Sequence, residues 1–112
     1  MMNDIEIGIA GAAGQGMQSI AFTLGKTFVR SGFFSFVYHD LMSRIRGGSN
    51  ISFVRVKNNQ ATSVSYLVDV LVALDRDAIL KNMKKLKTGA IVIFDGEKVK
   101  FDEVESGFVS VP

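Results

Sequence analysis

The chain has 112 residues and a mass of 12.2 kDa, which suits one small domain. Hydrophobic residues make up 47% and charged residues 21%, a globular composition that excludes a disordered chain. The net charge of +2 does not indicate a nucleic-acid partner, and the absence of cysteine excludes disulfides and cysteine-ligated iron–sulfur clusters within this chain. We find neither a basic apolar leader nor an apolar run long enough to span a bilayer, and therefore expect no membrane segment and a cytoplasmic location.

The first predicted element is a buried strand over residues 5–10, a short apolar run that is followed at once by glycines. Beyond Gly16, apolar residues recur at helical spacing, and Gly32 then suits a left-handed C-cap. A strand, a glycine-rich turn and a helix are the first half of a βαβ unit. The predicted helix stripe consists of Met17, Ile20, Ala21, Leu24 and Phe28.

Two further strands are predicted from alternating apolar residues, one over residues 33–39 and one over residues 50–57. Asn58-Asn59 predicts a turn into another strand over residues 60–66, which would form an antiparallel hairpin with residues 50–57. Residues 69–74 are a continuous apolar run, as expected of a strand that is buried on both faces.

Asp75 is predicted to cap a second helix, which ends at Gly89. Another buried strand is predicted over residues 90–94, and the tail over residues 97–112 alternates only weakly. We therefore expect a three-layer α/β fold with a mostly parallel sheet, one antiparallel hairpin and a Rossmann-like start. Since the tail brings no closing helix, we also expect the chain to be incomplete at its C-terminus. The inner stripe of the second helix is predicted to hold Ile79, Leu80, Met83 and Leu86.

The glycine-rich turn is the first candidate site. Glycine permits positive φ, and successive N–H groups that open a helix can hold a phosphate. Gly14-Gln15-Gly16 only nearly matches the dinucleotide fingerprint, so a tight turn that serves the fold alone is the favoured interpretation of the pattern. Cofactor binding by Gly11, Gly14, Gln15 and Gly16 is the functional alternative, and Asp40 lies where a ribose-binding acid is expected.

The second candidate site is a loop in which Arg44 and Arg46 precede Gly47 and Gly48. Two arginines before paired glycines can present guanidinium groups to a phosphate or a carboxylate. A solvated loop whose arginines pair with local acids or with an adjoining subunit fits the chemistry equally well. Apolar residues lie among the arginines and favour an interface, so these four residues are candidates for substrate or interface contact.

No catalytic residue and no metal site are predicted. His39 is the sole histidine, and no Ser or Cys lies at a recognisable spacing from it, although a contact with the adjacent Asp40 is compatible with the sequence. The lysines between residues 81 and 87 are interpreted as one solvated helix face.

Two motifs, in this order, resemble a known family. Residues 11–16 read Gly-Ala-Ala-Gly-Gln-Gly at the end of a strand, and residues 43–48 read Ser-Arg-Ile-Arg-Gly-Gly before a strand that contains Val54-Arg55-Val56. An apolar strand then ends in Ala73-Leu74-Asp75. This order resembles the gamma domain of the 2-oxoacid:ferredoxin (flavodoxin) oxidoreductases, in the form fused at the N-terminus of an alpha subunit. The resemblance covers nearly the whole chain, so residues 1–112 are interpreted as a single gamma-type domain. The family domain continues beyond Pro112, and many members carry glycine in place of Ala13.

The resemblance implies an enzyme complex that oxidatively decarboxylates a 2-oxoacid to an acyl-CoA and reduces ferredoxin. Thiamine diphosphate, magnesium and iron–sulfur clusters are then expected on the other domains or subunits, the thiamine-binding alpha and beta parts. This chain would bind no cofactor alone, but would pack against the catalytic domains and help to shape the approach of coenzyme A and substrate. The sequence does not distinguish pyruvate, ketoisovalerate, 2-oxoglutarate or aryl pyruvates as the substrate, because the oxoacid pocket is expected elsewhere.

Two alternatives remain at the level of sequence. One is a stand-alone nucleotide- or phosphate-binding α/β module, which would bind its ligand without a partner. The other is a purely structural subunit, whose glycines serve packing and which co-purifies with a larger chain.

Overall fold

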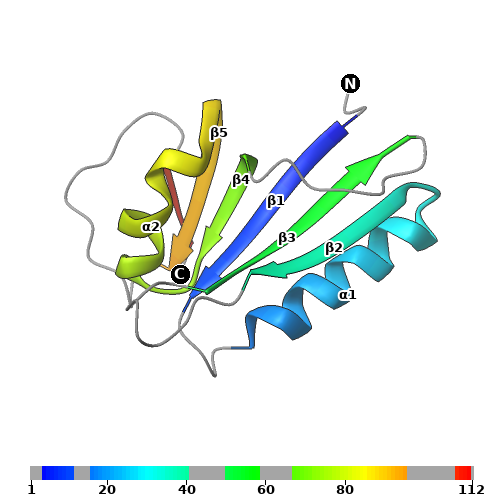
Figure 1. The fold of residues 1–112 in the computed structure, drawn as a ribbon, viewed down its shortest axis with the longest axis horizontal. Helices are drawn as coiled ribbons and strands as arrows, with labels where there is room; N and C mark the ends of the chain where they lie inside the picture. Colours follow the sequence, from blue (N-terminus) through cyan, green and yellow to red (C-terminus); the bar gives the residue numbers. More distant parts are fainter. Residues whose placement is uncertain (1–3, 12–15, 41–49, 59–66, 96–107, 112) are drawn as a thin grey trace.

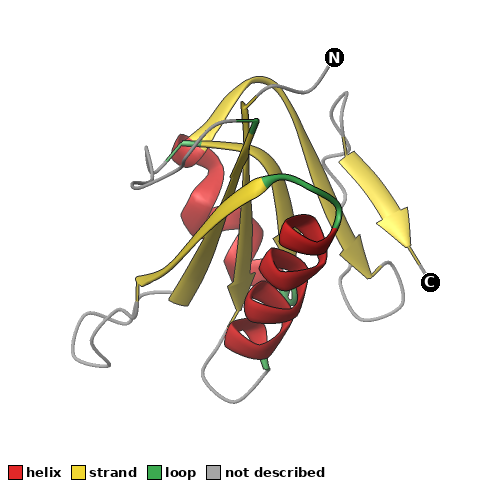
Figure 2. Cartoon of the chain, turned by 90° about the vertical axis from the view of Figure 1, so that its right-hand side faces the viewer, coloured by secondary structure: helices red, strands yellow, loops and turns green. Residues whose placement is uncertain are grey.

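The computed structural model describes residues 4–11, 16–40, 50–58, 67–95 and 108–111, the last of these as backbone only. These residues form one six-stranded sheet with a helix over each face (Figure 1, Figure 2). The helices are α1 (Met17–Arg30) and α2 (Arg76–Asn82), and a 3₁₀ turn, η2 (Met83–Lys85), follows α2. The strands are β1 (Asp4–Gly11), β2 (Phe34–Asp40), β3 (Asn50–Lys57), β4 (Val68–Ala73), β5 (Leu86–Asp95) and β6 (Phe108–Val111).

The strand order is β2-β3-β1-β4-β5-β6, and most neighbours are parallel. β1 pairs in parallel with β4, β4 with β5, and β5 with β6, whereas β3 is antiparallel to both β1 and β2. Therefore β3 alone among these strands runs against the others. The predicted three-layer, mostly parallel α/β fold is confirmed.

The antiparallel part of the sheet differs from the predicted hairpin. One side of β3 pairs with β1, from Asp4↔Lys57 to Gly11↔Asn50, and its other side pairs with β2, from Phe34↔Lys57 to Asp40↔Ile51. Both sides of β3 are thus occupied along its length by β1 and β2. Residues 60–66, the predicted hairpin partner, lie outside the described residues. The Asn-Asn turn signal is local, whereas long-range register decides which strands pair with β3.

The sheet is buried on both faces by two separate apolar clusters. On one face, Ile7 and Ile9 of β1 pack with Met17 and Ala21 of α1. On the other face, a cluster that includes Phe53 packs with α2. Because neighbouring strand residues point to opposite faces, the central strands must be apolar at nearly every position, which explains their continuous hydrophobic runs.

Helix α1 matches its prediction closely. Gly32 follows it with φ 96°, and the Phe33 N–H donates to the Phe28 carbonyl oxygen at 3.1 Å, a Schellman-type end. The rings of Phe28 and Phe33 meet edge to face with centroids 6.1 Å apart, which adds the apolar contact that accompanies such an end. Ile20 departs from the prediction, since it is 41% exposed instead of facing the core.

The second helix is shorter than predicted. It ends at Asn82, η2 follows, and β5 begins at Leu86, so Gly89 lies inside a strand and does not cap a helix. Gly89 has φ 80° and falls where the β4–β5 register shifts, between the pairs Val68↔Leu86 and Val70↔Ile91. Pairing of Leu86 with β4 therefore overrode the helical periodicity of this segment. The predicted inner residue Leu80 is 48% exposed.

Candidate functional site

The carboxyl ends of the parallel strands form one end of the sheet, here called the rim. It consists of Gly11, Asp40, Ala73 and Asp95 at strand ends, together with Asn50 at the start of β3. The arrowheads of β1, β4 and β5 point to this end of the sheet in Figure 1. In open α/β sheets, ligands bind outside the carboxyl ends of the strands.

The chain connections reverse direction between β1 and β4. The chain leaves β1, crosses by α1 and continues to β2 on one side of the sheet, whereas it leaves β4, crosses by α2 and continues to β5 on the other side. At this point the Leu74 N–H donates to the Ala10 carbonyl oxygen at 2.9 Å. Such a topological switch point is the usual ligand site of this fold class.

Gly16 lies at the rim as the N-cap of α1. Its backbone is left-handed, with φ 80° and ψ 16°, and no side chain caps the helix at this position. A Cβ added there would meet nothing within 4 Å, so backbone conformation and not crowding favours glycine. The first turn of α1 carries no acidic residue, so its positive dipole end suits an anion.

The described residues that flank the two predicted loops lie side by side. Gly11, which precedes the glycine turn, pairs with Asn50, and Asp40 pairs with Ile51, so the arginine loop begins and ends at the same rim. Adjacent strands are about 4.8 Å apart, which makes these anchor points immediate neighbours. The loops themselves, with Gly14, Gln15, Arg44, Arg46, Gly47 and Gly48, lie outside the described residues, and their contacts remain predictions.

Other polar residues that the sequence singled out have structural partners. The Asp75 carboxylate accepts a hydrogen bond from the Ala78 N–H at 2.8 Å, which confirms it as the cap of α2. His39 Nδ1 lies 2.7 Å from Ser52 Oγ, so the imidazole has a partner on β3. These contacts give Asp75 a capping role and His39 a partner on the neighbouring strand.

Charged pairs gather at the opposite end of the sheet, here called the base, which consists of Asp4, Arg55, Asp69 and Lys87. Arg55 donates to both carboxylate oxygens of Asp4, at 2.9 and 3.2 Å, and this hydrogen bonding lowers the pKa of Asp4 and raises that of Arg55. The Asp69 carboxylate accepts from the Glu6 N–H at 2.9 Å and pairs with Lys87 at 3.2 Å.

The described residues do not fit a resident metal or cluster. Among them, no group of three or more His, Cys, Asp or Glu side chains could hold a metal ion, and the whole chain lacks cysteine. Within the same residues, no helix has the length and apolarity to cross a membrane. The start of α1 is the feature that suits a ligand, and its chemistry suits an anionic group.

A mostly parallel α/β sheet with Gly11 and Gly16 on either side of the β1–α1 connection defines a fold class with many functions. The sequence narrows this class, because a family model described as "Pyruvate ferredoxin/flavodoxin oxidoreductase" matches residues 6–112. The chain belongs to this family, which confirms the resemblance seen in the two glycine motifs.

Curated relatives are much longer than this chain. An alpha subunit of a 2-oxoacid:ferredoxin oxidoreductase from Sulfolobus sp. is 24% identical over 98 residues, which are 88% of this chain and 16% of the relative. A corresponding subunit from Aeropyrum pernix is 27% identical over 94 residues, 84% of this chain and 15% of the relative. The chain thus spans about a sixth of each of these relatives.

Solved structures share the fold. The 2-oxoglutarate:ferredoxin oxidoreductase of Magnetococcus marinus, with 2-oxoglutarate, coenzyme A and succinyl-CoA bound, matches 100% of this chain and 20% of its own, with a TM-score of 0.81 and 24% identity. The gamma subunit of a keto/oxoacid ferredoxin oxidoreductase from Geobacter sulfurreducens matches 96% of this chain and 59% of its own, with a TM-score of 0.75 and 23% identity.

Proposed function

We propose that this chain is a domain of a 2-oxoacid:ferredoxin oxidoreductase and that it is inactive without the remainder of that enzyme. The complete enzyme would oxidatively decarboxylate a 2-oxoacid to an acyl-CoA and pass the electrons to ferredoxin. The family match over residues 6–112 carries this proposal, and the small share of the relatives that the chain covers is the reason for assigning it a part of the enzyme.

The role proposed for this domain is to bind and orient, and not to transfer protons. The N–H groups at the start of α1 and the guanidinium groups of Arg44 and Arg46 would hold a phosphate or carboxylate at the rim. Support comes from the left-handed Gly16, the absence of acids in the first turn of α1 and the paired anchors Gly11 and Asn50. Candidate contacts are Gly11, Gly14, Gln15, Gly16, Arg44, Arg46, Gly47 and Gly48.

Coenzyme A is the proposed occupant or near neighbour of the rim, because it carries phosphates and takes part in the proposed reaction. Thiamine diphosphate, magnesium and the iron–sulfur clusters are proposed to belong to other parts of the enzyme. The chain lacks cysteine, and its described residues offer no group of three or more His, Cys, Asp or Glu side chains for a metal ion. When bound in those other parts, these cofactors would supply the decarboxylation and electron-transfer chemistry. Ferredoxin as acceptor and a cytoplasmic location stay predictions.

The first experiment tests membership of the complex. The chain, carrying a tag, would be co-expressed with thiamine-binding oxidoreductase subunits from the same genome. The captured material would be assayed for coenzyme A-dependent oxidation of 2-oxoacids. We expect a stable complex with activity. Capture of the chain alone, combined with tight calorimetric binding of NAD, FAD, ATP or coenzyme A, would favour the stand-alone module instead.

The second experiment tests the rim within the assembled enzyme. Arg46→Ala should leave assembly intact and raise the coenzyme A concentration needed for half-maximal rate by about tenfold, because a charge-assisted contact is lost. Lys84→Ala is a matched control, because Lys84 is an exposed cation in η2, away from the rim anchors. Equal coenzyme A dependence in both variants would show that Arg46 is not part of the site.

A further inference from the structure

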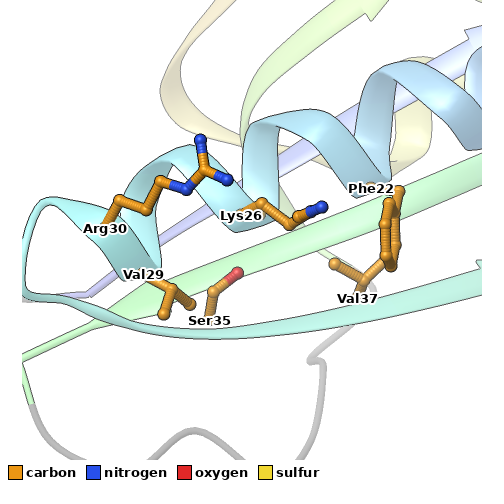
Figure 3. Close-up of a pocket in the computed structure, with 7 residues that line it drawn as sticks. Phe22, Lys26, Val29, Arg30, Ser35 and Val37 are labelled. Carbon is orange, nitrogen blue, oxygen red and sulfur yellow. The ribbon is translucent and has the colours of Figure 1, made fainter.

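A groove lies between α1 and β2, the strand at one edge of the sheet (Figure 3). Its volume is about 260 Å³, and it is open to solvent along the helix. Ligand pockets usually enclose about 300–1,000 Å³, so this groove suits a side chain better than a cofactor. Its lining includes Phe22, Lys26, Val29 and Arg30 of α1 and Ser35 and Val37 of β2.

Gly25 sets the depth of the groove. It is buried, and a Cβ added there would lie 2.8 Å from Val37 Cγ2 and 3.1 Å from Ser35 Oγ, so the missing side chain lets the helix approach β2 closely. On either side of this contact, Phe22 is 59% exposed and Val29 is 55% exposed. The result is a cleft with a closed floor and apolar walls that the described residues leave uncovered.

The floor holds an unpaired hydroxyl. Ser35 Oγ is buried and has no hydrogen-bond partner among the described residues. Figure 3 shows it between Val29 and Val37, on the side that faces α1. Buried polar atoms in proteins are nearly always paired, so a polar group that displaces the side chains over this hydroxyl would gain a hydrogen bond.

The groove is also positively charged. Lys26 and Arg30 are both exposed and lie one helical turn apart, where like charges repel. Lys26 Nζ lies 5.2 Å from the centroid of the Phe22 ring, but neither cation forms an ion pair among the described residues. No residue of α1 is acidic, so a carboxylate from outside the helix would relieve this repulsion.

We infer that this groove binds an extended segment of the remaining oxidoreductase polypeptide. The segment places an acidic side chain between Lys26 and Arg30, an apolar side chain between Phe22 and Val29, and a polar group on Ser35. This inference rests on the proposed function, because it assumes that the chain assembles into a larger enzyme. It assigns the contact to the α1–β2 edge and not to the rim.

Two other occupants fit the groove less well. A second copy in a two-fold contact would set Lys26 and Arg30 against their own equivalents, and like charges directly opposed are unfavourable. The acid-rich stretch over residues 96–107 is anchored at Asp95 and Phe108, on the two strands at the other edge of the sheet. Charge complementarity therefore favours an acidic segment of the partner polypeptide.

Charge reversal in the co-expressed enzyme tests this inference. Lys26→Glu with Arg30→Glu should weaken association with the remaining polypeptide by about tenfold or more, measured as a dissociation constant. The matched control is Arg76→Glu with Lys84→Glu, which changes the charge equally at exposed residues of α2 and η2 and should leave association within about twofold. Lys26→Gln with Arg30→Gln should give an intermediate loss, and circular dichroism verifies that each variant is folded.

Ser35→Ala gives a second readout that a structural role would not produce. It should preserve or raise the melting temperature of the 112-residue chain, because it removes an unpaired buried hydroxyl, and yet weaken association. If the wild-type enzyme assembles and all groove variants bind as it does, the groove inference fails and the proposed function stands. Dimers of the chain that Lys26→Glu with Arg30→Glu abolishes would reassign the groove to a second copy. Failure of the wild-type chain to assemble would overturn the proposed function itself.

Discussion

The two ends of the sheet are built differently. At the base, side-chain contacts join neighbouring strands. Asp4 is bound to Arg55, and Asp69 is bound to both Lys87 and the Glu6 N–H. At the rim, helix α1 instead begins at a left-handed glycine without a side-chain cap. The comparison indicates that side-chain contacts secure the strands at the base, while the candidate site at the rim is built on the backbone of α1.

The two ends are connected by strand register. β1 and β3 stay in register from Asp4↔Lys57 at the base to Gly11↔Asn50 at the rim. A shift of one residue would turn every side chain of a strand to the other face, so the apolar clusters and the base contacts together fix where the rim loops begin. Substitutions at each end should therefore have distinct effects, and four predictions follow from the largest expected effect to the smallest.

Asp69→Ala should have the largest effect, at the base. It removes the acceptor of the Glu6 N–H, and because Glu6 is 1% exposed, water cannot easily replace that acceptor. We expect the free energy of unfolding to fall by about 1–3 kcal/mol, measured by urea denaturation. Asp69→Asn keeps an acceptor oxygen and should lose less; equal losses would show that the contact with Glu6 contributes little.

Gly16→Ala tests the rim. Alanine at φ 80° should cost about 1–2 kcal/mol of unfolding free energy, because its Cβ disfavours the left-handed conformation. Gly16→Asn should cost less, since asparagine tolerates that region. The comparison of the two ends would be weakened if both variants were as stable as the wild-type chain in thermal unfolding.

Asp75→Ala tests a residue next to the rim that serves stability. Loss of the 2.8 Å capping bond to the Ala78 N–H should lower the unfolding free energy by about 1 kcal/mol. Asp75→Ser supplies another capping oxygen and should restore most of this loss in the same denaturation assay. Failure of serine to restore stability would assign a different role to this carboxylate.

Asp4→Asn should have the smallest effect, because the Asp4 side chain is 43% exposed and such ion pairs contribute about 1 kcal/mol or less. Arg55 lowers the pKa of folded Asp4, so the stabilisation is present above the unfolded pKa of about 4 and is lost as pH falls through the lowered value. The difference in unfolding free energy between wild type and variant should therefore vanish in strong acid. A difference that grew in acid would contradict this sign.

Sequence patterns predicted the central architecture because local chemistry and burial agree there. β1, α1, β3 and the Asp75 cap lie where periodicity, glycine and capping rules place them. The predicted extent of α2 was wrong. The spacing of Met83 and Leu86 fits a helix, and only the pairing of Leu86 with Val68 shows that a strand begins there. Helical periodicity alone cannot show that a neighbouring strand will take up a segment.

The two candidate surfaces differed in how well the sequence predicted them. The rim could be predicted because its glycines are unusual in composition, although the described residues confirm its anchors and not its loop contacts. The α1–β2 groove gave no comparable signal, since Phe22, Lys26 and Val29 resemble any exposed helix face. Its floor depends on Gly25 meeting Val37, a contact between elements that no single pattern reveals.

The position of β3 between β1 and β2 has an evolutionary consequence. Because Asp40 and Asn50 are held in adjacent strands, the segment that joins them can be exchanged or lengthened without moving either anchor. The entropic cost of a longer connection rises only slowly with its length. A lineage could therefore change what the rim recognises by substituting one short segment of chain, while the rest of the domain keeps its fold.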